Sequence, residues 1–314
     1  MALKLKRVTD MHLKGSKEVI EMVEKMRDAG GFMGRNLAEA AMIFSDMVND
    51  RTCTKMLSFT ADIVATGLRG ILIDMVKERM VDAIITTCGT LDHDIARTYS
   101  SYYHGSFYMD DSQLKRMGYH RLGNIIIPED AYGPTIEKKV QPILEEIYSS
   151  SPRRTSPSEL SRVIGERLGE NSLLYWCSKM NVPVFVPGIV DGAVGSQVWL
   201  FCERRRDFQM DVVEDERRLS NIIFDSERRG GLAIGGGISK HHLIWWSQFK
   251  GGLDYACYIT TAIEYDGSLS GAHVREAVSW GKVKPNAKKA TVFSDATVAL
   301  PLIYCYAASK YNKA

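Results

Sequence analysis

The seven residues Glu276-Ala-Val-Ser-Trp280-Gly-Lys282 combine the side chains needed for covalent amine chemistry. A lysine amine attacks an imine or a carbonyl only in its neutral form, which desolvation favours. An aromatic side chain such as Trp280 can supply that dry surface, and the face of its ring also attracts a cationic substrate. The carboxylate of Glu276 could orient such a substrate. Taken alone, Trp-Gly-Lys is more typical of a turn that ends in a solvated lysine.

Four segments rich in small and acidic residues follow predicted strands, at 86–94, 188–196, 235–242 and 294–297. In open parallel sheets, ligands bind beyond the carboxyl ends of the strands. Glycines there let the backbone approach a phosphate, and a helix that follows adds a partial positive charge. Aspartates such as Asp191 or Asp295 could accept hydrogen bonds from ribose hydroxyls. These features suit a dinucleotide, although the Gly-x-Gly-x-x-Gly fingerprint is absent and a triple glycine is often only a tight turn.

Two histidine-containing runs invite a metal interpretation, which their spacing disfavours. His241 and His242 are adjacent, and neighbouring residues on a helix point in different directions. Asp92-His93-Asp94 has the same spacing and opens a predicted helix, where aspartates act as caps. We therefore predict no metal site. A single histidine that presents a neutral nitrogen to a polar substrate is the preferred alternative.

Short apolar runs alternate with amphipathic segments along the chain, which predicts an α/β protein with a mostly parallel sheet and helices on both faces. We expect one domain over residues 1–314, with residues 1–50 as an N-terminal helical extension packed on it. The predicted strands are 55–59, 82–87, 124–128, 183–187, 232–234, 255–259 and 291–293. The predicted helices are 18–27, 37–48, 68–80, 160–168, 173–180, 212–224 and 242–249.

Composition excludes several classes of function. The 314 residues are 45% hydrophobic and 25% charged, and the net charge of +2 gives no field for nucleic acid or a membrane surface. The six cysteines are scattered without a Cys-x-x-Cys pair, which argues against zinc and against a disulfide framework. The first residues lack the apolar core of a signal peptide, and no apolar run reaches the length of a membrane span. A cytoplasmic location is expected.

Several long motifs, in a fixed order and over nearly the whole chain, resemble the deoxyhypusine synthase family. They are Thr66-Gly-Leu-Arg69, Thr86-Thr-x-Gly89, Asp191-Gly-x-x-Gly195, Gly235-Gly-Gly-x-x-Lys-His-His242, Thr261-Ala-x-Glu-Tyr-Asp-Gly-Ser-x-Ser-Gly-Ala272 and Glu276–Lys282. The resemblance implies a Rossmann-like NAD-binding fold. It also implies a homotetramer with active sites at dimer interfaces and no metal.

The resemblance further implies an NAD-dependent transfer in hypusine biosynthesis. An aminobutyl group would pass from spermidine, through an imine on an enzyme lysine, to a lysine of translation initiation factor 5A. By motif match, Lys282 is the covalent carrier. The expected amine-binding residues are Asp92, His93, His241, Gly267, Ser268, Glu276 and Trp280. The expected NAD contacts are Thr87, Gly89, Asp191, Gly236, Thr261, Ala262, Asp295 and Ala296.

The chain departs from the family where eukaryotic members carry acids facing the polyamine. His93, Ser196 and Leu269 occupy those three positions. Loss of a buried carboxylate that pairs with an ammonium costs several kcal/mol unless other groups compensate. Other acids could take over this role, with Asp94, Glu264 and Asp266 as the candidates.

The departures leave the amine substrate open. The first alternative is a homospermidine synthase-type enzyme that passes the same group to a free diamine such as putrescine. A non-catalytic NAD- or polyamine-binding regulator and a conventional dehydrogenase are the other two. Lys240, next to the triple glycine, could contact a phosphate or simply begin a helix.

Overall fold

The computed structural model describes residues 5–150 and 152–312, and they form two compact units. Unit 1 contains the residues up to Met11 together with Ala61–Ile73 and Thr87–Val212. Unit 2 contains His12–Thr60, Asp74–Thr86 and the residues from Val213 onward. Helix α3 (Leu68–Lys77) contains one boundary between them. That the chain acts as a single domain stays a prediction.

Unit 2 is built on parallel strands in the order β11-β10-β9-β1-β2. Central Leu57 pairs with Leu232 on one side and with Ile84 on the other, and all three side chains are fully buried. Burial on both faces explains why these strands read as continuous apolar runs. The strands are β1 (Cys53–Phe59), β2 (Ala83–Ile85), β9 (Arg228–Ile234), β10 (Leu253–Thr260) and β11 (Val283–Phe293).

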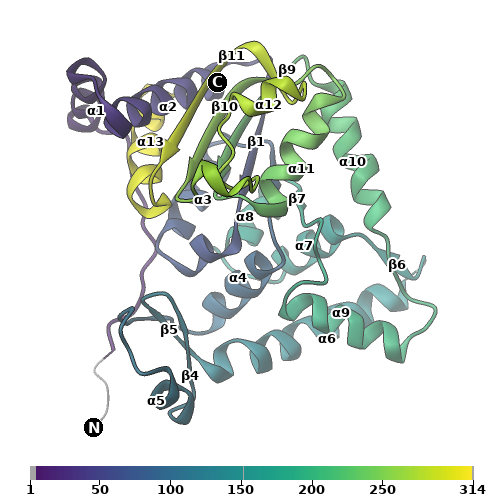
Figure 1. Ribbon diagram of the computed structural model, residues 1–314. Coiled ribbons are helices and arrows are strands. Elements are labelled where there is room, and N and C mark those ends of the chain that lie inside the picture. The colour runs from purple at the N-terminus through teal and green to yellow at the C-terminus, as the bar shows by residue number, and fades with distance from the viewer. Residues whose placement is uncertain (1–4, 151, 313–314) are drawn as a thin grey trace. The chain divides into compact units, whose positions relative to one another are not determined.

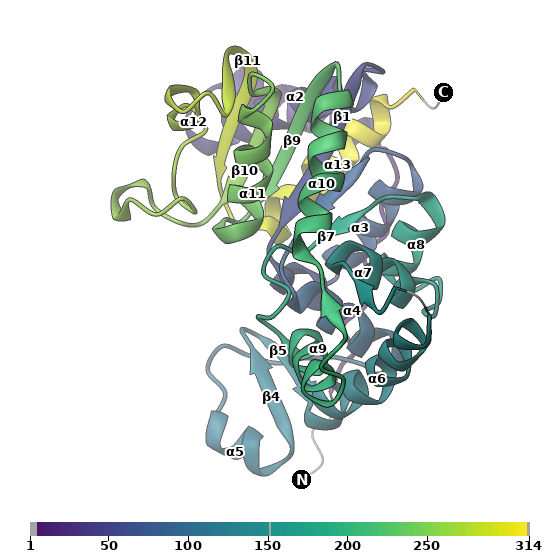
Figure 2. The same cartoon turned by 90° about the vertical axis from the view of Figure 1, so that its right-hand side faces the viewer.

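Helices cover both faces of these strands (Figures 1 and 2). Helices α2 (Phe32–Asn49) and α13 (Ala296–Lys310) pack on one face, with α1 (Lys17–Ala29) against them, and α11 (Gly237–Gln248) packs on the other. The predicted α/β fold with a mostly parallel sheet is confirmed. Unit 2 also contains α10 (Val212–Asp225) from its second residue on, α12 (Glu276–Ser279) and the short 3-10 turn Glu264–Asp266.

Unit 1 is mainly helical, with three small sheet segments. Its helices are α4 (Gly89–Tyr99), α5 (Asp111–Arg116), α6 (Gly133–Ser149), α7 (Pro157–Gly165), α8 (Leu173–Met180) and α9 (Ala193–Arg204), with 3-10 turns at Ala61–Ala65 and Glu129–Ala131. Its strands are β3 (Tyr103–His104), β4 (Tyr119–Leu122), β5 (Ile125–Pro128), β6 (Arg154–Thr155), β7 (Val184–Phe185) and β8 (Gln209–Met210).

One predicted strand has a different setting from the expected one. The run 124–128 is strand β5, but it pairs antiparallel with β3 and β4 and not within a parallel sheet. Gly123, with φ of 57°, makes the tight turn that leads from β4 into β5. An apolar run predicts a buried strand but does not give the direction of its neighbours.

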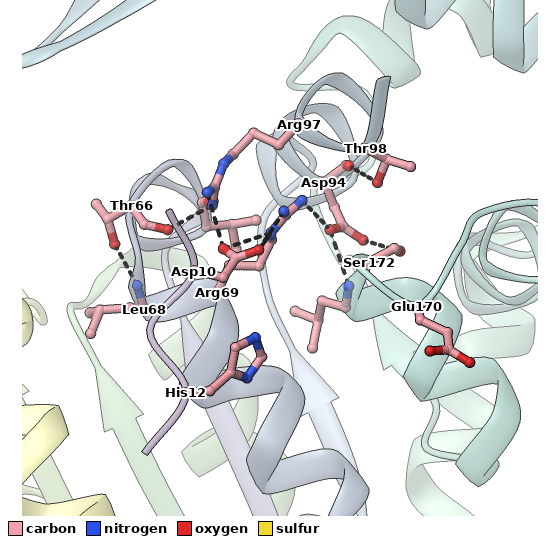
Figure 3. A network of polar contacts seen from close by, with 12 residues as sticks. Asp10, His12, Thr66, Leu68, Arg69, Asp94, Arg97, Thr98, Glu170 and Ser172 are labelled. Carbon is pink, nitrogen blue, oxygen red and sulfur yellow. Dashed lines mark hydrogen bonds and ion pairs between the residues drawn. The ribbon is translucent and has the colours of Figure 1, made fainter. Parts of the chain in front are cut away.

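A buried polar network crosses unit 1 (Figure 3). Asp94 is fully buried and accepts hydrogen bonds from Ser172 Oγ at 2.6 Å and Leu174 N at 2.8 Å, at the start of α8. Arg69 lies 3.3 Å from Asp94 and 2.6 Å from Asp10. The expectation that Asp94 could hold an amine substrate is therefore wrong, because its oxygens are occupied by protein donors away from solvent.

Candidate active site

A pocket of about 310 Å³ in unit 2 gathers four predicted site residues, His241, Glu276, Trp280 and Lys282. Gly267, also predicted, lines the same pocket. The walls come from α11, β10, the segment after β10, and α12 with the turn that follows it. The remaining lining residues are Lys240, Ile244, Trp245, Tyr258, Leu269, Ala272, His273 and Ala277.

The backbone of Lys282 is fixed in the turn between α12 and β11. Its N–H donates to Ala277 O at 2.9 Å, and its carbonyl accepts from Leu253 N at 3.1 Å. Gly281 has a φ of 68°, which a glycine adopts without strain. These contacts fix the Cα of Lys282, from which its side chain reaches the pocket.

Aromatic rings surround the Lys282 amine. Its Nζ lies 5.1 Å from the Trp280 ring centroid and 5.8 Å from that of Trp245, and the residue is only 7% exposed. The ring of His241 stacks on Trp245 at 5.6 Å. Trp245 was missed in the sequence, although it lies four positions after His241 and therefore on the same helix face. The surroundings of Lys282 are thus those of a partly desolvated amine.

His241 is the second polar group beside this amine. Burial, and then the positive charge of Lys282, lower the pKa of its imidazole below the ordinary value of 6.5. A neutral ring has one nitrogen that donates and one that accepts a hydrogen bond. His241 can therefore exchange a proton with an amine at neutral pH, as the neutral histidine predicted from the sequence would.

Lys240 is more deeply buried than Lys282. It is 1% exposed, and its Nζ donates to Leu269 O at 2.8 Å and to Ala272 O at 3.0 Å. Burial lowers the pKa of this amine to about 8, against an opposing effect of Glu276. Lys240 thus holds the backbone of the segment that forms one side of the pocket.

Tyr258 presents the pocket with a buried hydroxyl. Among residues 5–150 and 152–312, none donates to or accepts from this oxygen. Burial raises the pKa of the phenol, and the carboxylate of Glu276 raises it further. Buried polar groups nearly always have a partner, so this hydroxyl is an exception among the residues that the structure describes.

The predicted cofactor residues of unit 2 follow the carboxyl ends of neighbouring strands. Gly236 follows β9, Thr261 and Ala262 follow β10, and Asp295 and Ala296 follow β11. These strands are neighbours and parallel, so their carboxyl ends lie side by side.

The turn after β9 has the backbone shape that a phosphate needs. Gly235 and Gly237 have φ of 78° and 62°, and no atom lies within 4 Å of where a Cβ on Gly237 would stand. Asp295 is exposed and accepts from Thr297 N at 2.8 Å. A glycine turn at a helix start fits a phosphate, and an exposed carboxylate after β11, two strands away at the same ends of the parallel strands, fits a ribose.

The other predicted cofactor residues, Thr87, Gly89 and Asp191, belong to unit 1. Thr87 Oγ1 accepts from Ala61 N at 3.2 Å, Gly89 is the first residue of α4, and Asp191 is exposed. Their roles stay predictions. Ser268, in unit 2, is exposed and its N–H donates to Asp266 at 2.7 Å, so it does not line the pocket.

Asp92, predicted to hold the amine, caps a helix of unit 1. It is fully buried and accepts from Ala193 N at 2.9 Å, Val194 N at 2.8 Å and the Tyr132 hydroxyl at 2.8 Å. Burial raises the pKa of this carboxyl, while the two backbone donors oppose the rise. The carboxylate satisfies the first N–H groups of α9, which is a structural role.

His93 is buried in unit 1, with Nδ1 3.0 Å from the Tyr102 hydroxyl, and burial lowers its pKa to about 4.

In the unfolded chain the His93 imidazole takes up a proton near pH 6.5, whereas in the folded protein it does so only near pH 4. Acidification from pH 6.5 to 4 therefore favours unfolding. We expect His93→Gln to remove roughly 3 kcal/mol of that acid-induced loss. Urea unfolding between pH 4.5 and 7.5 measures it. His120→Gln, at an exposed histidine, is the control, and equal slopes in wild type and His93→Gln would contradict the expectation.

No three His, Cys, Asp or Glu side chains within residues 5–150 and 152–312 are grouped so that they could hold a metal ion. Over the same ranges, none of the helices has the length and apolar character needed to cross a bilayer.

Comparison with known proteins gives one family. The deoxyhypusine synthase family model matches residues 21–307. A protein named "Probable deoxyhypusine synthase" from Thermoplasma volcanium is 50% identical over 95% of this chain and 96% of its own length. The Ignicoccus hospitalis protein of that name is 46% identical over 98% of this chain and 97% of its own length. A crystal structure of an Entamoeba histolytica protein carrying the same enzyme name has a TM-score of 0.67 at 21% identity, over 96% of this chain and 99% of that one, and it supports the fold.

Proposed function

This chain belongs to the deoxyhypusine synthase family of aminobutyl transferases, and on that premise we propose that it passes an aminobutyl group from spermidine to a lysine of translation initiation factor 5A, with NAD as cofactor. The observation that carries the proposal is the position of Lys282. Its amine lies 5.1 Å and 5.8 Å from the ring centroids of Trp280 and Trp245, in a pocket of about 310 Å³ that His241, with its lowered pKa, also lines.

In the proposed reaction, Lys282 carries the group covalently. Its neutral amine adds to the imine carbon of oxidised spermidine, and the C–N bond to the departing diamine breaks, so that a new imine to Lys282 Nζ replaces the old one. The acceptor lysine then displaces Lys282 by the same exchange. His241, which lines the same pocket, would move protons at these nitrogens, and the burial of Lys282 would limit access of water to the imine.

Glu276 and Tyr258 would orient the amine. Glu276 is an acid that lines the pocket and can pair with an ammonium group, and the unpartnered Tyr258 hydroxyl can accept or donate a hydrogen bond. Leu269 lines the pocket where eukaryotic family members carry an acid, so this wall contacts methylenes and not an ammonium.

NAD, when bound, supplies the hydride acceptor and donor for the oxidation and the final reduction. We assign the turns after β9, β10 and β11 to it, with Gly236 for a phosphate and Asp295 for a ribose. The further assignments of Thr87, Gly89, Asp191, Thr261, Ala262 and Ala296 belong to the same proposal. The free thiols of the six cysteines suit a reducing cytoplasm.

A homotetramer is part of the proposal. Trp280 is 64% exposed and Trp245 is 41% exposed, although both line the pocket. Exposed aromatic side chains are typical of surfaces that another subunit covers. Light scattering coupled to gel filtration measures the mass.

The test supplies the protein with NAD and spermidine labelled in its butyl group. Factor 5A is offered in one reaction and putrescine in another. Label on the factor-5A lysine, dependent on NAD, supports the proposal. Label only on putrescine would replace it with the homospermidine synthase-type reaction, and accumulation of NADH without transfer would point to a dehydrogenase.

A further inference from the structure

The segment 263–273, between β10 and α12, forms one side of the pocket. Gly267, Leu269, Ala272 and His273 all line it. Apart from the 3-10 turn at its start the segment has no regular secondary structure, and residues 263–268 are exposed. Its position must therefore come from a few specific contacts with the elements below it.

The first contact is Ser270, which attaches the segment to the glycine turn. Thr260 Oγ1 donates to Ser270 O at 3.0 Å, and Gly237 N donates to Ser270 Oγ at 3.1 Å. A Cβ on Gly236 would stand 2.4 Å from Ser270 Cα, so the two backbones are in direct contact. Ser270 therefore joins the segment to the glycine turn after β9, which contains the predicted cofactor residue Gly236.

The second contact is Lys240, which holds the segment from inside the pocket. Its ammonium has three N–H donors, and two of them are directed to the carbonyls of Leu269 and Ala272. The Tyr258 ring centroid lies 4.2 Å from Nζ, within cation–π range. All three interaction sites of the ammonium are thus occupied by the protein.

We infer that Lys240 is a positioning residue that fixes segment 263–273 over the pocket and so sets the binding of the amine substrate. The occupied ammonium makes Lys240 unsuited to be a second imine carrier: its nitrogen is engaged by two carbonyls, whereas Lys282 Nζ lies near the rings of Trp245 and Trp280. Without Lys240, two inward carbonyls lose their donor, and the segment is then held by Ser270 and, at its end, by the hydrogen bonds of His273 with Arg275 and Glu276.

The kinetic part of this inference rests on the proposed function, and the structural part does not. Lys240→Met keeps a long, unbranched side chain, one atom shorter than that of lysine, but removes every donor. Hydrogen exchange of peptides covering 263–273, measured without NAD or amine, is expected to quicken about tenfold. The KM for spermidine is expected to rise about tenfold while kcat changes less than about threefold. Lys240→Arg retains donors, so its exchange rate in 263–273 and its KM for spermidine should lie between those of wild type and Lys240→Met.

Lys250→Met is the matched control. Lys250 also donates to two backbone carbonyls, those of Phe224 and Ser226, but lies after the far end of α11 and does not line the pocket. It should leave exchange in 263–273 and the spermidine KM unchanged. Wild-type exchange of 263–273 in Lys240→Met would overturn the inference. So would a fall in kcat at constant KM. If wild type transferred no label, the proposed function would fail, while the exchange measurement would still decide the role of Lys240.

Discussion

Replacing Asp94 with alanine is expected to lower the free energy of unfolding by about 3–5 kcal/mol. The carboxylate is fully buried and receives donors from three directions: the Ser172 hydroxyl, the first N–H groups of α8, and Arg69. Alanine leaves those donors without an acceptor and leaves Arg69 with Asp10 alone. Such a loss is far larger than that of an exposed ion pair, because water cannot replace the missing oxygen atoms.

Urea unfolding of Asp94→Ala, followed by circular dichroism, measures the loss. Asp111→Ala is the matched control, because Asp111 also pairs with an arginine, Arg121 at 2.6 Å, but is exposed. It should leave the midpoint nearly unchanged. Asp94→Asn keeps one acceptor oxygen, so its loss of unfolding free energy should lie between those of Asp94→Ala and Asp111→Ala. Equal midpoints for Asp94→Ala and Asp111→Ala would show that the network does not stabilise unit 1.

The position of Gly236, Thr261 and Asp295 at the carboxyl ends of neighbouring parallel strands could be predicted from the sequence. Each residue follows a short apolar run, and the carboxyl ends of parallel strands lie at one edge. The structure confirms that placement, with β9, β10 and β11 as neighbours. The prediction worked because strand periodicity and the position after a strand are local properties of the chain.

The roles of the acids could not be predicted in this way. Asp92 and Asp94 lie two residues apart on α4, yet one caps α9 and the other caps α8. Their partners lie about 80 to 100 positions later in the chain. A sequence shows an acid but not whether its oxygens face solvent, a substrate or the start of another helix.

The contacts of Lys240 were hidden for a different reason. Its acceptors are the backbone carbonyls of Leu269 and Ala272, and every residue has a carbonyl. No residue type at those positions could have revealed the contact. Only folding, which brings α11 under segment 263–273, distinguishes Lys240 from a solvated lysine at a helix start.

Lys282→Arg is expected to abolish aminobutyl transfer and to leave NAD binding unchanged. A guanidinium stays protonated at any pH the protein tolerates, so it cannot form the imine. It does retain the positive charge beside Trp280 and Trp245, so the pocket keeps its electrostatic character. Loss of the covalent step should reduce transfer by at least about 1,000-fold, which corresponds to roughly 4 kcal/mol of lost transition-state stabilisation.

Borohydride reduction in the presence of NAD and labelled spermidine, followed by peptide mapping, identifies the carrier. Label should appear on the Lys282 peptide of wild type and be missing from Lys282→Arg, while NAD fluorescence titration gives the same Kd for both. Lys284→Arg is the control, because Lys284 is two residues away and pairs with Asp254 at 2.7 Å, a contact that arginine preserves. Full transfer by Lys282→Arg, or label on the Lys240 peptide in its place, would show that the Lys282 amine is not the group that carries the butyl chain.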